Sequence, residues 1–433
     1  MAADAREAAL EVLTACRKAD AWADGALKAV TARSGLSPRD AALAARITYT
    51  VLQNRMLLDY HIKNLCKNPD LEPVVLDILR IGACQILLLD RIPVSAAVNS
   101  AVELAKKHHR ARAAGLINAV LRNLDRSRER LSEPEDLSIR FSHPQWLVER
   151  CVALLGREEA IRFLAANNAP VPTTIQRNPL LCCREQLLEE LGDTHWEPHP
   201  WLEDCYEVSG TGNLEQMPSF QKGHFFVQDA AAALVSLVAG CRPGMTVLDV
   251  CAAPGGKSFS AAIAMENRGT VLSRDIHPHK LKLIEASAKR LGITCIQTGL
   301  ADARRVDEAM ERAADVVICD VPCSGLGIIR KKPDIRYKDP AELTGLPPVQ
   351  KQILSAAAEA VKPGGCLVYS TCTILPEENR QVVDGFLAEN HRFALEPFSL
   401  PSPVGDTGGD LTLWPQRHQT DGFYICKLRR IHD

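Results

Sequence analysis

Apolar residues recur at helical spacing through roughly the first 130 residues of the chain. Ala, Leu, Val and Ile return every three or four positions, and helix-favouring residues fill the positions between them. The clearest stretches are residues 5–16, 39–65, 74–89 and 95–107. This pattern predicts an all-α helical bundle, which we place at residues 1–135. The segment has no glycine-rich loop and no candidate acid–base pair, which indicates a binding module rather than a catalyst.

The pattern becomes less regular over residues 136–220. Prolines interrupt this part of the chain repeatedly. The stretch "TTIQRN" (173–178) predicts a short strand, and "REQLLEELG" (184–192) predicts a short helix that ends at a glycine. We therefore expect a small α+β connector subdomain between two larger domains.

From about residue 221, short apolar runs alternate with helical stretches. Amphipathic or apolar helical patterns, such as residues 280–292 and 349–365, lie between several of the runs. Alternation of this kind predicts a mostly parallel sheet with helices on both faces, and we assign residues 221–433 to such an α/β domain. The runs that predict strands are residues 246–250, 270–275, 294–299, 316–320, 366–371 and 423–428.

Composition limits the classes of protein that remain. A chain of 433 residues is long enough for two or three domains, and its 46% hydrophobic and 24% charged content is ordinary for a globular protein. The longest apolar stretch, Ala230–Cys241, is about half of the ~20 residues that a membrane span needs. The N-terminus carries charges where a signal peptide would need an apolar run. We therefore expect a cytoplasmic protein with no membrane partner.

The cysteines and the charges refine this expectation. The fifteen cysteines are scattered, without CxxC pairs or Cys/His ligand spacing, so we expect reduced thiols and no metal site. Net charge is −2 overall, but residues 1–143 carry +4 and residues 144–433 carry −6. The basic excess gathers in residues 106–112 and 121–130. Such clusters suit phosphate binding, although a solvated helix face explains them as well.

Candidate chemistry lies where the predicted strands end, which is where ligands bind in open α/β sheets. The first strand runs into "DVCAAPGGKS" (249–258), whose paired glycines allow a ligand to approach the backbone. Its spacing is neither GxGxxG nor that of a P-loop. One acid at a strand end is often only a helix cap, but four acids and two cysteines at successive strand ends favour a catalytic site. They are Asp249, Asp275, Asp302, Asp320, Cys323 and Cys372.

Three motifs carry a family resemblance. "DVCAAPGGKS", "DVPCSGLGIIRKKPDI" and "YSTCTILPEEN" resemble those of the RNA 5-methylcytosine methyltransferases that use S-adenosylmethionine. In the first domain, "RIPVSAAVNSAVELAK" and "GLINAVLRN" resemble the RNA-binding NusB fold. The connector motifs "SHPQWLVER" and "ANNAPVP" and the following "FVQDAAAAL" complete the likeness. Over essentially its whole length the chain resembles the RsmB (Sun/Fmu) family of 16S rRNA cytosine-C5 methyltransferases.

This resemblance implies a Rossmann-like class I methyltransferase domain with a mostly parallel, seven-stranded sheet. It also implies roles for individual residues. Asp275 would hold the ribose hydroxyls of the cofactor, Asp302 would meet its adenine, and Asp320 would lie near the methyl donor and the target base. Cys372 would be the nucleophile, and Cys323 would assist release of the product. The loop around the rest of the cofactor would be Cys251, Ala252, Ala253, Pro254, Gly255, Gly256 and Lys257.

The motifs depart from the usual family pattern at three points. Val321 stands where alanine is usual, and Thr373 stands where serine is usual; both keep the character of the site. Asp302 lacks the glycine that usually follows it directly. The role of Asp302 therefore depends on the weakest match of the three acids assigned to the cofactor.

The implied partner is 16S rRNA or a small-subunit assembly intermediate, and family analogy points to cytosine 967. Nothing in the sequence requires more than a monomer. Two alternatives stay open: an RNA-binding, antitermination-type factor with an inactive methyltransferase scaffold, and a DNA cytosine-5 methyltransferase in which Cys323 is the nucleophile. The candidate phosphate contacts are Lys106, Lys107, Arg110 and Arg112 in the helical domain, and Arg330, Lys331 and Lys332 after the second motif.

Overall fold

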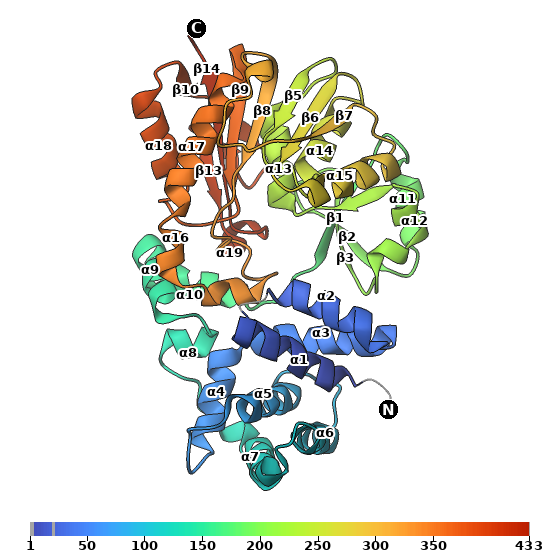
Figure 1. Cartoon of the computed structure of the whole chain (residues 1–433), viewed down its shortest axis with the longest axis vertical. Helices are drawn as coiled ribbons and strands as arrows, with labels where there is room; N and C mark the ends of the chain where they lie inside the picture. Colours follow the sequence, from blue (N-terminus) through green and yellow to red (C-terminus); the bar gives the residue numbers. More distant parts are fainter. Residues whose placement is uncertain (1–3, 20–21, 433) are drawn as a thin grey trace. The chain divides into compact units, whose positions relative to one another are not determined.

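The computed structural model describes residues 4–19 and 22–432 (Figure 1). It divides into two compact units. The helical unit contains the chain as far as Ala169 together with a later segment, Ile329–Lys338. The sheet unit contains Pro170–Ile328 and the chain from Asp339 onward. The predicted connector, residues 136–220, is therefore divided between the two units after Ala169.

The helical unit confirms the helices that the apolar spacing predicts. α5 is its central element and packs against α1, α3, α4, α6 and α7. Gly82 allows the approach of α7, because a Cβ at this position would lie 2.5 Å from a methyl carbon of Leu121. The α-helices are α1 (Ala5–Ala19), α2 (Ala23–Ser34), α3 (Pro38–Gln53), α4 (Arg55–Asn64), α5 (Pro73–Leu87), α6 (Val94–Lys107), α7 (Ala114–Arg126), α8 (Leu137–Phe141), α9 (Gln145–Leu155) and α10 (Arg157–Ala166).

A buried arginine holds the returning segment in the helical unit. Arg336, in the 3₁₀ turn Pro333–Tyr337, is fully buried. Its Nη1 donates to the main-chain oxygens of Gln53 (2.9 Å) and Ser142 (3.1 Å), at the C-terminal ends of α3 and α8, and to Asn168 Oδ1 (3.0 Å). Carbonyl groups at a helix end carry partial negative charge and lack intrahelical partners, so they compensate a buried cation. Burial still lowers the pKa of the Arg336 guanidinium to about 10.

The sheet unit begins with a small antiparallel sheet in the order β2-β3-β1-β4. This confirms the strand predicted at residues 173–178 and the helix predicted at residues 184–192. The strands are β1 (Thr173–Arg177), β2 (His195–Pro198), β3 (Cys205–Ser209) and β4 (Phe225–Val227), and the helices are α11 (Arg184–Leu191) and α12 (Pro218–Gln221).

Over the described residues the main sheet has eight strands, one more than the seven that the resemblance implied: seven in the order β10-β14-β9-β8-β5-β6-β7, and β13 paired with β14. β5 to β9 are parallel, whereas β14 is antiparallel to β9, so the sheet is mixed but mostly parallel, as predicted. Each of the six predicted runs forms a strand. The strands are β5 (Thr246–Asp249), β6 (Thr270–Asp275), β7 (Ile296–Leu300), β8 (Ala314–Asp320), β9 (Val361–Thr371), β10 (Phe393–Leu395), β13 (Asp410–Leu413) and β14 (Phe423–Arg430); β11 (Ser399–Leu400) and β12 (Gly405–Asp406) pair separately.

Helices cover both faces of the main sheet (Figure 1). Alternate residues of each strand point to opposite faces. On β8, Val316 and Ile318 therefore pack in the cluster with α13, α14 and α15, whereas Val317 and Cys319 pack in the cluster with α17 and α18. The helices are α13 (Ala230–Ala239), α14 (Gly256–Ala264), α15 (Pro278–Arg290), α16 (Pro340–Leu343), α17 (Leu346–Glu359), α18 (Arg380–Glu389) and α19 (Pro415–His418). No helix among residues 4–19 and 22–432 is long and apolar enough to cross a membrane.

We predict that Arg336→Ala lowers the free energy of unfolding of the helical unit by about 3 kcal/mol, because it leaves buried carbonyl groups without donors and opens a cavity. Denaturant unfolding followed by circular dichroism measures the change. Arg162→Ala is the matched control, since Arg162 is exposed and makes only an i,i+3 ion pair with Glu159; its effect should stay below about 0.5 kcal/mol. Equal effects of the two substitutions would contradict the anchoring role of Arg336.

Candidate active site

The predicted site residues meet where the strand order of the main sheet reverses. β5 lies between β6 and β8, so the loops after β5, β6 and β8 open at one edge of the sheet. In doubly wound sheets this switch point forms the ligand-binding crevice. Asp249, Asp275 and Asp320 are the last residues of these three strands, and Cys372 follows β9, the next parallel neighbour.

The two candidate thiols lie in contact. β8 and β9 pair in parallel with Asp320 opposite Ser370, so the loops that follow them are adjacent. The sulfur atoms of Cys323 and Cys372 are 3.2 Å apart, and both side chains are partly buried. The hydrogen bond with Cys372, together with burial, raises the pKa of the Cys323 thiol well above its usual value. Cys323 is therefore held as a neutral thiol beside Cys372.

Most other cysteines fill the core, as expected. All fifteen cysteines lie among the described residues, and the structure forms no disulfide between any two of them. Cys84 and Cys241 are typical, because burial raises the pKa of each thiol to about 12. Raised pKa values of this kind make structural cysteines unreactive near neutral pH.

A partly buried ion pair lies beside the thiols. Lys257, in the first turn of α14, donates from Nζ to Asp320 Oδ2 at 2.6 Å, and Ser370 Oγ donates to Asp320 Oδ1 at 2.7 Å. Although burial opposes the charge on Lys257, the Asp320 carboxylate raises its pKa. The lysine ammonium also lies 5.5 Å from the centre of the Phe423 ring. Lys257 therefore remains a cation, and Asp320 is fixed between two donors.

A second carboxylate, Asp249, lies in the core beneath the loop after β5. Asp249 is completely buried and accepts from Ser258 Oγ at 2.7 Å, and Ser273 Oγ donates to Ser258 Oγ at 2.8 Å. Burial raises the pKa of the Asp249 carboxyl to about 7. These contacts join β5, β6 and α14, so Asp249 holds the loop in shape.

Asp275 and Asp302 occupy different environments. Asp275 is 7% exposed and accepts from the main-chain nitrogens of His277 (2.9 Å) and Ala253 (3.4 Å), which ties the end of β6 to the loop after β5. Asp302 follows β7 and is paired with Arg304 at 2.7 Å, and the hydrogen bonds from Arg304 lower the pKa of the Asp302 carboxyl to about 2. A ligand that binds Asp302 must therefore compete with Arg304.

A cavity of about 470 Å³ opens beside the loop that follows β5. Its lining includes the loop residues Cys251–Pro254, the Lys257–Asp320 pair, and Gln228 from the turn between β4 and α13. Gln228 is 7% exposed; its Oε1 accepts from Ser260 Oγ at 2.7 Å, whereas its Nε2 has no hydrogen-bond partner among the residues that the structure describes. The cavity therefore offers one buried amide donor to a ligand.

No role was assigned from the sequence to two residues of the site, Gln228 and Glu378. Gln228 carries no strand-end signal, and only its place in "FVQDAAAAL" pointed to it. Glu378 is 1% exposed and joins the two cysteine loops. Its Oε2 accepts from Ser324 N and from Gln350 Nε2, both at 2.8 Å, and Thr373 Oγ1 donates to Oε1 at 3.3 Å. The acidic pair "EE" after Cys372 was the available signal for Glu378.

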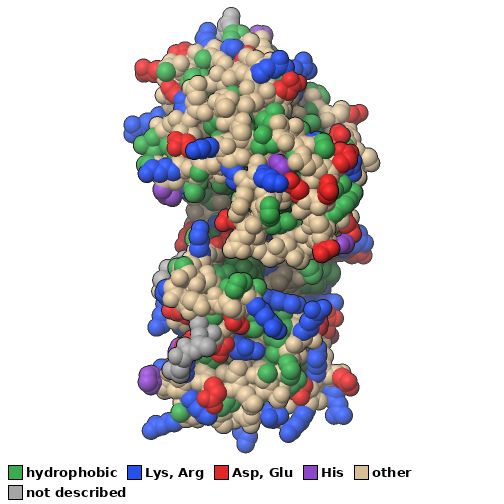
Figure 2. All heavy atoms as spheres, turned by 90° about the vertical axis from the view of Figure 1, so that its right-hand side faces the viewer, with side chains coloured by type: hydrophobic (Ala, Val, Ile, Leu, Met, Phe, Trp, Pro, Cys, Tyr) green, Lys and Arg blue, Asp and Glu red, His purple; other side chains and the backbone are tan. Residues whose placement is uncertain are grey.

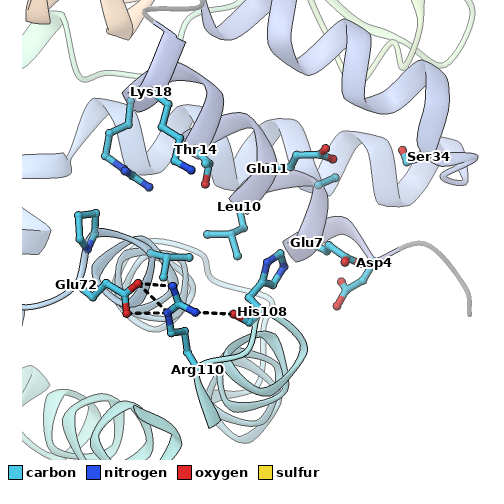
Figure 3. Close-up of a pocket in the computed structure, with 14 residues that line it drawn as sticks. Asp4, Glu7, Leu10, Glu11, Thr14, Lys18, Ser34, Glu72, His108 and Arg110 are labelled. Atoms are coloured by element: carbon cyan, nitrogen blue, oxygen red, sulfur yellow. Dashed lines mark hydrogen bonds and ion pairs between the residues drawn. The ribbon is translucent and has the colours of Figure 1, made fainter. Parts of the chain in front are cut away.

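The candidate phosphate contacts lie in the helical unit. Lys106 pairs with Glu103 at 2.7 Å and Lys107 pairs with Glu7. Arg110 binds both carboxylate oxygens of Glu72, on the wall of a cavity of about 620 Å³ (Figure 3). Lys332 lies 3.4 Å from Asp24. Arg330, Lys331 and Lys332 belong to the segment that returns to this unit, and Arg112 is exposed. Figure 2 shows cationic and anionic side chains interspersed on one face.

The described residues contain no group of three or more His, Cys, Asp or Glu side chains that could hold a metal ion. They do fit S-adenosylmethionine. Gly255 has a φ of +111°, and a Cβ on it would lie 2.4 Å from the Phe259 ring, so the loop keeps a shape that only glycine allows. The unpaired Gln228 amide and the cavity beside this loop provide room and a donor for a polar ligand.

Three family profiles match consecutive parts of the chain. The NusB family profile matches residues 3–126, the ferredoxin-like domain of RsmF/B-like methyltransferases matches residues 143–214, and 16S rRNA methyltransferase RsmB/F matches residues 237–429. Among solved structures, that of PH0851 covers 98% of both chains with a TM-score of 0.80 at 26% identity. A methyltransferase homolog from Pyrococcus horikoshii covers 68% of this chain and 98% of its own, with a TM-score of 0.59 at 26% identity.

Named relatives extend over nearly the whole chain. The probable ribosomal RNA small subunit methyltransferase B of Bacillus subtilis is 36% identical over 98% of each protein. Ribosomal RNA small subunit methyltransferase B of Salmonella typhi is 34% identical over 91% of each. Together with the methyltransferase fold and the loop that fits the cofactor, this similarity shows that the chain belongs to the RsmB/F family of 16S rRNA methyltransferases, which methylate ribosomal RNA with S-adenosylmethionine.

Proposed function

We propose that the chain methylates C5 of a cytosine in 16S rRNA through a covalent bond between Cys372 and C6 of the base. The observation that carries this proposal is the pair of thiols 3.2 Å apart beside the Lys257–Asp320 ion pair. The resemblance to the RsmB family points to cytosine 967 as the target. The substrate is 16S rRNA, free or within an assembling small subunit.

The loop after β5 would hold the cofactor. Cys251, Ala252, Ala253, Pro254, Gly255, Gly256 and Lys257 would surround it, with Asp275 at the ribose hydroxyls and Asp302 at the adenine. S-adenosylmethionine supplies an electrophilic methyl group when it is bound. Two features support this assignment: Gly255 and Gly256 have no side chain to keep a ligand away from the main chain, and the amide of Gln228 lines the cavity.

Cys372 would act as the nucleophile. Cytosine C5 attacks an electrophile poorly, but addition of a thiolate to C6 makes the ring an enamine whose C5 is nucleophilic. The Cys323 sulfur lies 3.2 Å from the Cys372 sulfur, so the Cys323 thiol can donate a hydrogen bond to the nucleophile. The hydrogen bond with Cys372 and burial raise the pKa of the Cys323 thiol; the trapping experiment below separates this assignment from the reverse one, in which Cys323 attacks the base.

Asp320 would bind the edge of the cytosine ring. Its carboxylate would hydrogen-bond N3 through a proton taken up from water when the base binds, and this proton would neutralise the charge that moves onto N3 during addition. Lys257 and Ser370 fix the orientation of this carboxylate, and Lys257 offers a positive charge beside it. The target base must leave its stack to reach these groups.

Release of the product reverses the addition. A base removes the proton from C5, the C5=C6 bond forms again, and the bond from C6 to the Cys372 sulfur breaks. Cys323 lies within hydrogen-bond distance of this departing sulfur and would assist its release. A water molecule, or Cys323 after it has passed its own proton to the departing Cys372 sulfur, would take the C5 proton.

The rival function is an RNA-binding factor with an inactive methyltransferase scaffold. The contact between two thiols, the ordered ion pair and the glycine loop that fits a cofactor all disfavour it. Calorimetric titration with S-adenosylmethionine separates the two functions, because an inactive scaffold should show no binding.

The first prediction concerns the covalent adduct. RNA that carries 5-fluorocytidine at the target should remain attached to the protein, since fluorine at C5 blocks the final elimination. The wild-type protein and Cys323→Ala should give the adduct, whereas Cys372→Ala should not. Denaturing gel electrophoresis with labelled RNA measures the attachment.

Two outcomes of this trapping experiment would contradict the proposal. Trapping by Cys372→Ala but not by Cys323→Ala would reverse the two roles and match the DNA-enzyme alternative. No trapping by the wild-type protein, together with no binding of S-adenosylmethionine, would favour the inactive scaffold.

The second prediction concerns Gly327, where the two cysteine loops approach closely. Its nitrogen donates to Cys372 O at 3.0 Å, and a Cβ on it would lie 1.8 Å from Gly422 O and 2.9 Å from Cys372 O. Gly327→Ala should therefore move the nucleophile and lower the rate of trapping by about 100-fold, because small misplacements of reacting groups are costly. Binding of S-adenosylmethionine should persist.

Gly345→Ala is the matched control for this substitution, since no heavy atom lies within 4 Å of the Cβ position and its φ is negative. It should trap RNA at the wild-type rate. If Gly327→Ala trapped equally fast, the close approach would have no part in positioning Cys372.

The third prediction concerns the basic cluster after α6. Replacement of Lys106, Lys107, Arg110 and Arg112 by alanine should weaken RNA binding and flatten its salt dependence. The exposed ion pairs with Glu103, Glu7 and Glu72 are weak enough to exchange for phosphates. Filter binding across a series of salt concentrations gives both quantities, and unchanged affinity and slope would remove this cluster from the RNA-binding surface.

A further inference from the structure

An exposed tryptophan and two lysines form one surface of the helical unit. Trp22 lies directly before α2 and is 51% exposed. The ammonium of Lys338 lies 4.9 Å from the centre of its indole ring, and Lys332 lies 3.4 Å from Asp24, in the first turn of the same helix. We propose that this aromatic-basic surface, made by Trp22, Lys332 and Lys338, binds an unpaired segment of the RNA substrate. The inference rests on the proposed RNA substrate and adds a second contact region to it.

The position of Trp22 has no explanation in the folding of the helix. N-cap positions favour Ser, Thr, Asp or Asn, whose side chains accept a hydrogen bond from the first turn. Trp22 occupies the N-cap of α2 with extended backbone angles and makes no such bond. Among the residues that the structure describes, it is also the one tryptophan whose side chain is classed as exposed. A large aromatic face that serves neither a cap nor the core is available for a ligand.

The surface is held rigidly. Asp334 Oδ2 accepts from the main-chain nitrogen of Ala23 at 2.9 Å, which joins the returning segment to the first residue of α2. Arg336 and Tyr337 anchor the same segment, because the Tyr337 hydroxyl donates to Leu52 O at 2.8 Å and the Arg336 side chain is buried. The lysines on either side of this anchored turn therefore start from fixed backbone positions, which reduces the entropy lost on binding.

The charge of the returning segment favours a polyanion. Residues 329–338 contain five basic side chains and one acidic side chain, a net charge of +4. Asp24 is the acid that faces Lys332, and the Tyr49 hydroxyl donates to it as well. The Lys332–Asp24 pair is half exposed, so a phosphate can replace Asp24 at little cost.

The pairing of indole and ammonium favours an unpaired nucleotide over a duplex. Every base has a face that can stack on an aromatic ring, and a nearby lysine reaches the adjoining phosphate. Bases inside an A-form helix are already stacked and cannot lie on Trp22, so a duplex would engage only the lysines. An acidic protein segment would use the lysines in the same way, without stacking.

The test titrates the full-length protein against a fluorescently labelled single-stranded RNA, the same sequence as a duplex, and polyglutamate. Anisotropy of the label measures affinity, and tryptophan emission of the protein reports contact with Trp22. Single-stranded RNA should quench tryptophan emission through Trp22. Trp22→Ala should bind this RNA about tenfold more weakly, whereas Trp22→Phe should stay within about threefold of wild type, because phenylalanine keeps a stacking face. Trp196→Phe, in β2 of the sheet unit, is the control and should keep the quenching.

The lysines have a separate readout. Replacing Lys332 and Lys338 together by alanine should reduce the slope of log affinity against log salt by about 1.4, since each phosphate contact on a single strand contributes about 0.7. Melting temperatures of all variants, measured in parallel, show whether each protein is folded. A variant that fails to fold is replaced by Trp22→Phe or by the single-lysine substitutions.

Three results would overturn the inference. The first is that Trp22→Ala binds RNA with wild-type affinity, and the second is that the wild-type protein binds duplex and single strand equally well. The third is that polyglutamate displaces RNA and that Trp22→Ala loses polyglutamate binding as much as RNA binding, which would indicate a protein partner. The proposed chemistry fails independently, through the absence of 5-fluorocytidine trapping by the wild-type protein. Trapping without any effect of Trp22 would leave the chemistry standing and reject this surface.

Discussion

The parallel pairing of β8 with β9 is the constraint on which the candidate site depends. It places Asp320 opposite Ser370 and brings together two loops whose cysteines are 49 residues apart in the sequence. Buried groups then hold the loops in register. Glu378 accepts from the Ser324 backbone in one loop and from the Thr373 hydroxyl in the other, and Gly327 donates to the main chain of Cys372. The distance between the thiols thus follows from sheet register and buried hydrogen bonds.

Residues of the same type at similar sequence positions have different roles here, because they differ in burial and in charged neighbours. Asp249 and Asp320 both end strands, yet Asp249 is sealed beneath the loop by two serines, whereas Asp320 lines the cavity and is paired with Lys257. Cys319 and Cys323 are only four residues apart. Cys319 points into the core behind the sheet, whereas Cys323 touches Cys372. Strand alternation and the degree of burial decide which member of each pair can reach a ligand.

Local patterns predicted the elements of this fold well, because helices and parallel strands leave a periodic record in the sequence. The strand at residues 173–178, six of the eight strands that the structure describes in the main sheet, and the positions of Cys323 and Cys372 after strand ends could all be anticipated. Long-range packing left no such record. The return of residues 329–338 to the helical unit depends on Arg336, whose burial no local pattern in the sequence indicates. The roles of Gln228 and Glu378 likewise depend on neighbours that lie far away in the chain.

The helical unit is discontinuous in sequence, and this affects how it can form during synthesis. Domains generally fold as units as they leave the ribosome, from the N-terminus onward. Here the donors for the carbonyl groups at the ends of α3 and α8 are supplied by Arg336, about 170 residues after the last helix of the unit ends at Ala166. A nascent chain that has extruded only the first 169 residues therefore holds helices whose packing is unfinished. The bundle is complete only after β5 to β8 have been made, which links maturation of the N-terminal part of the chain to synthesis of the loop that carries Cys323.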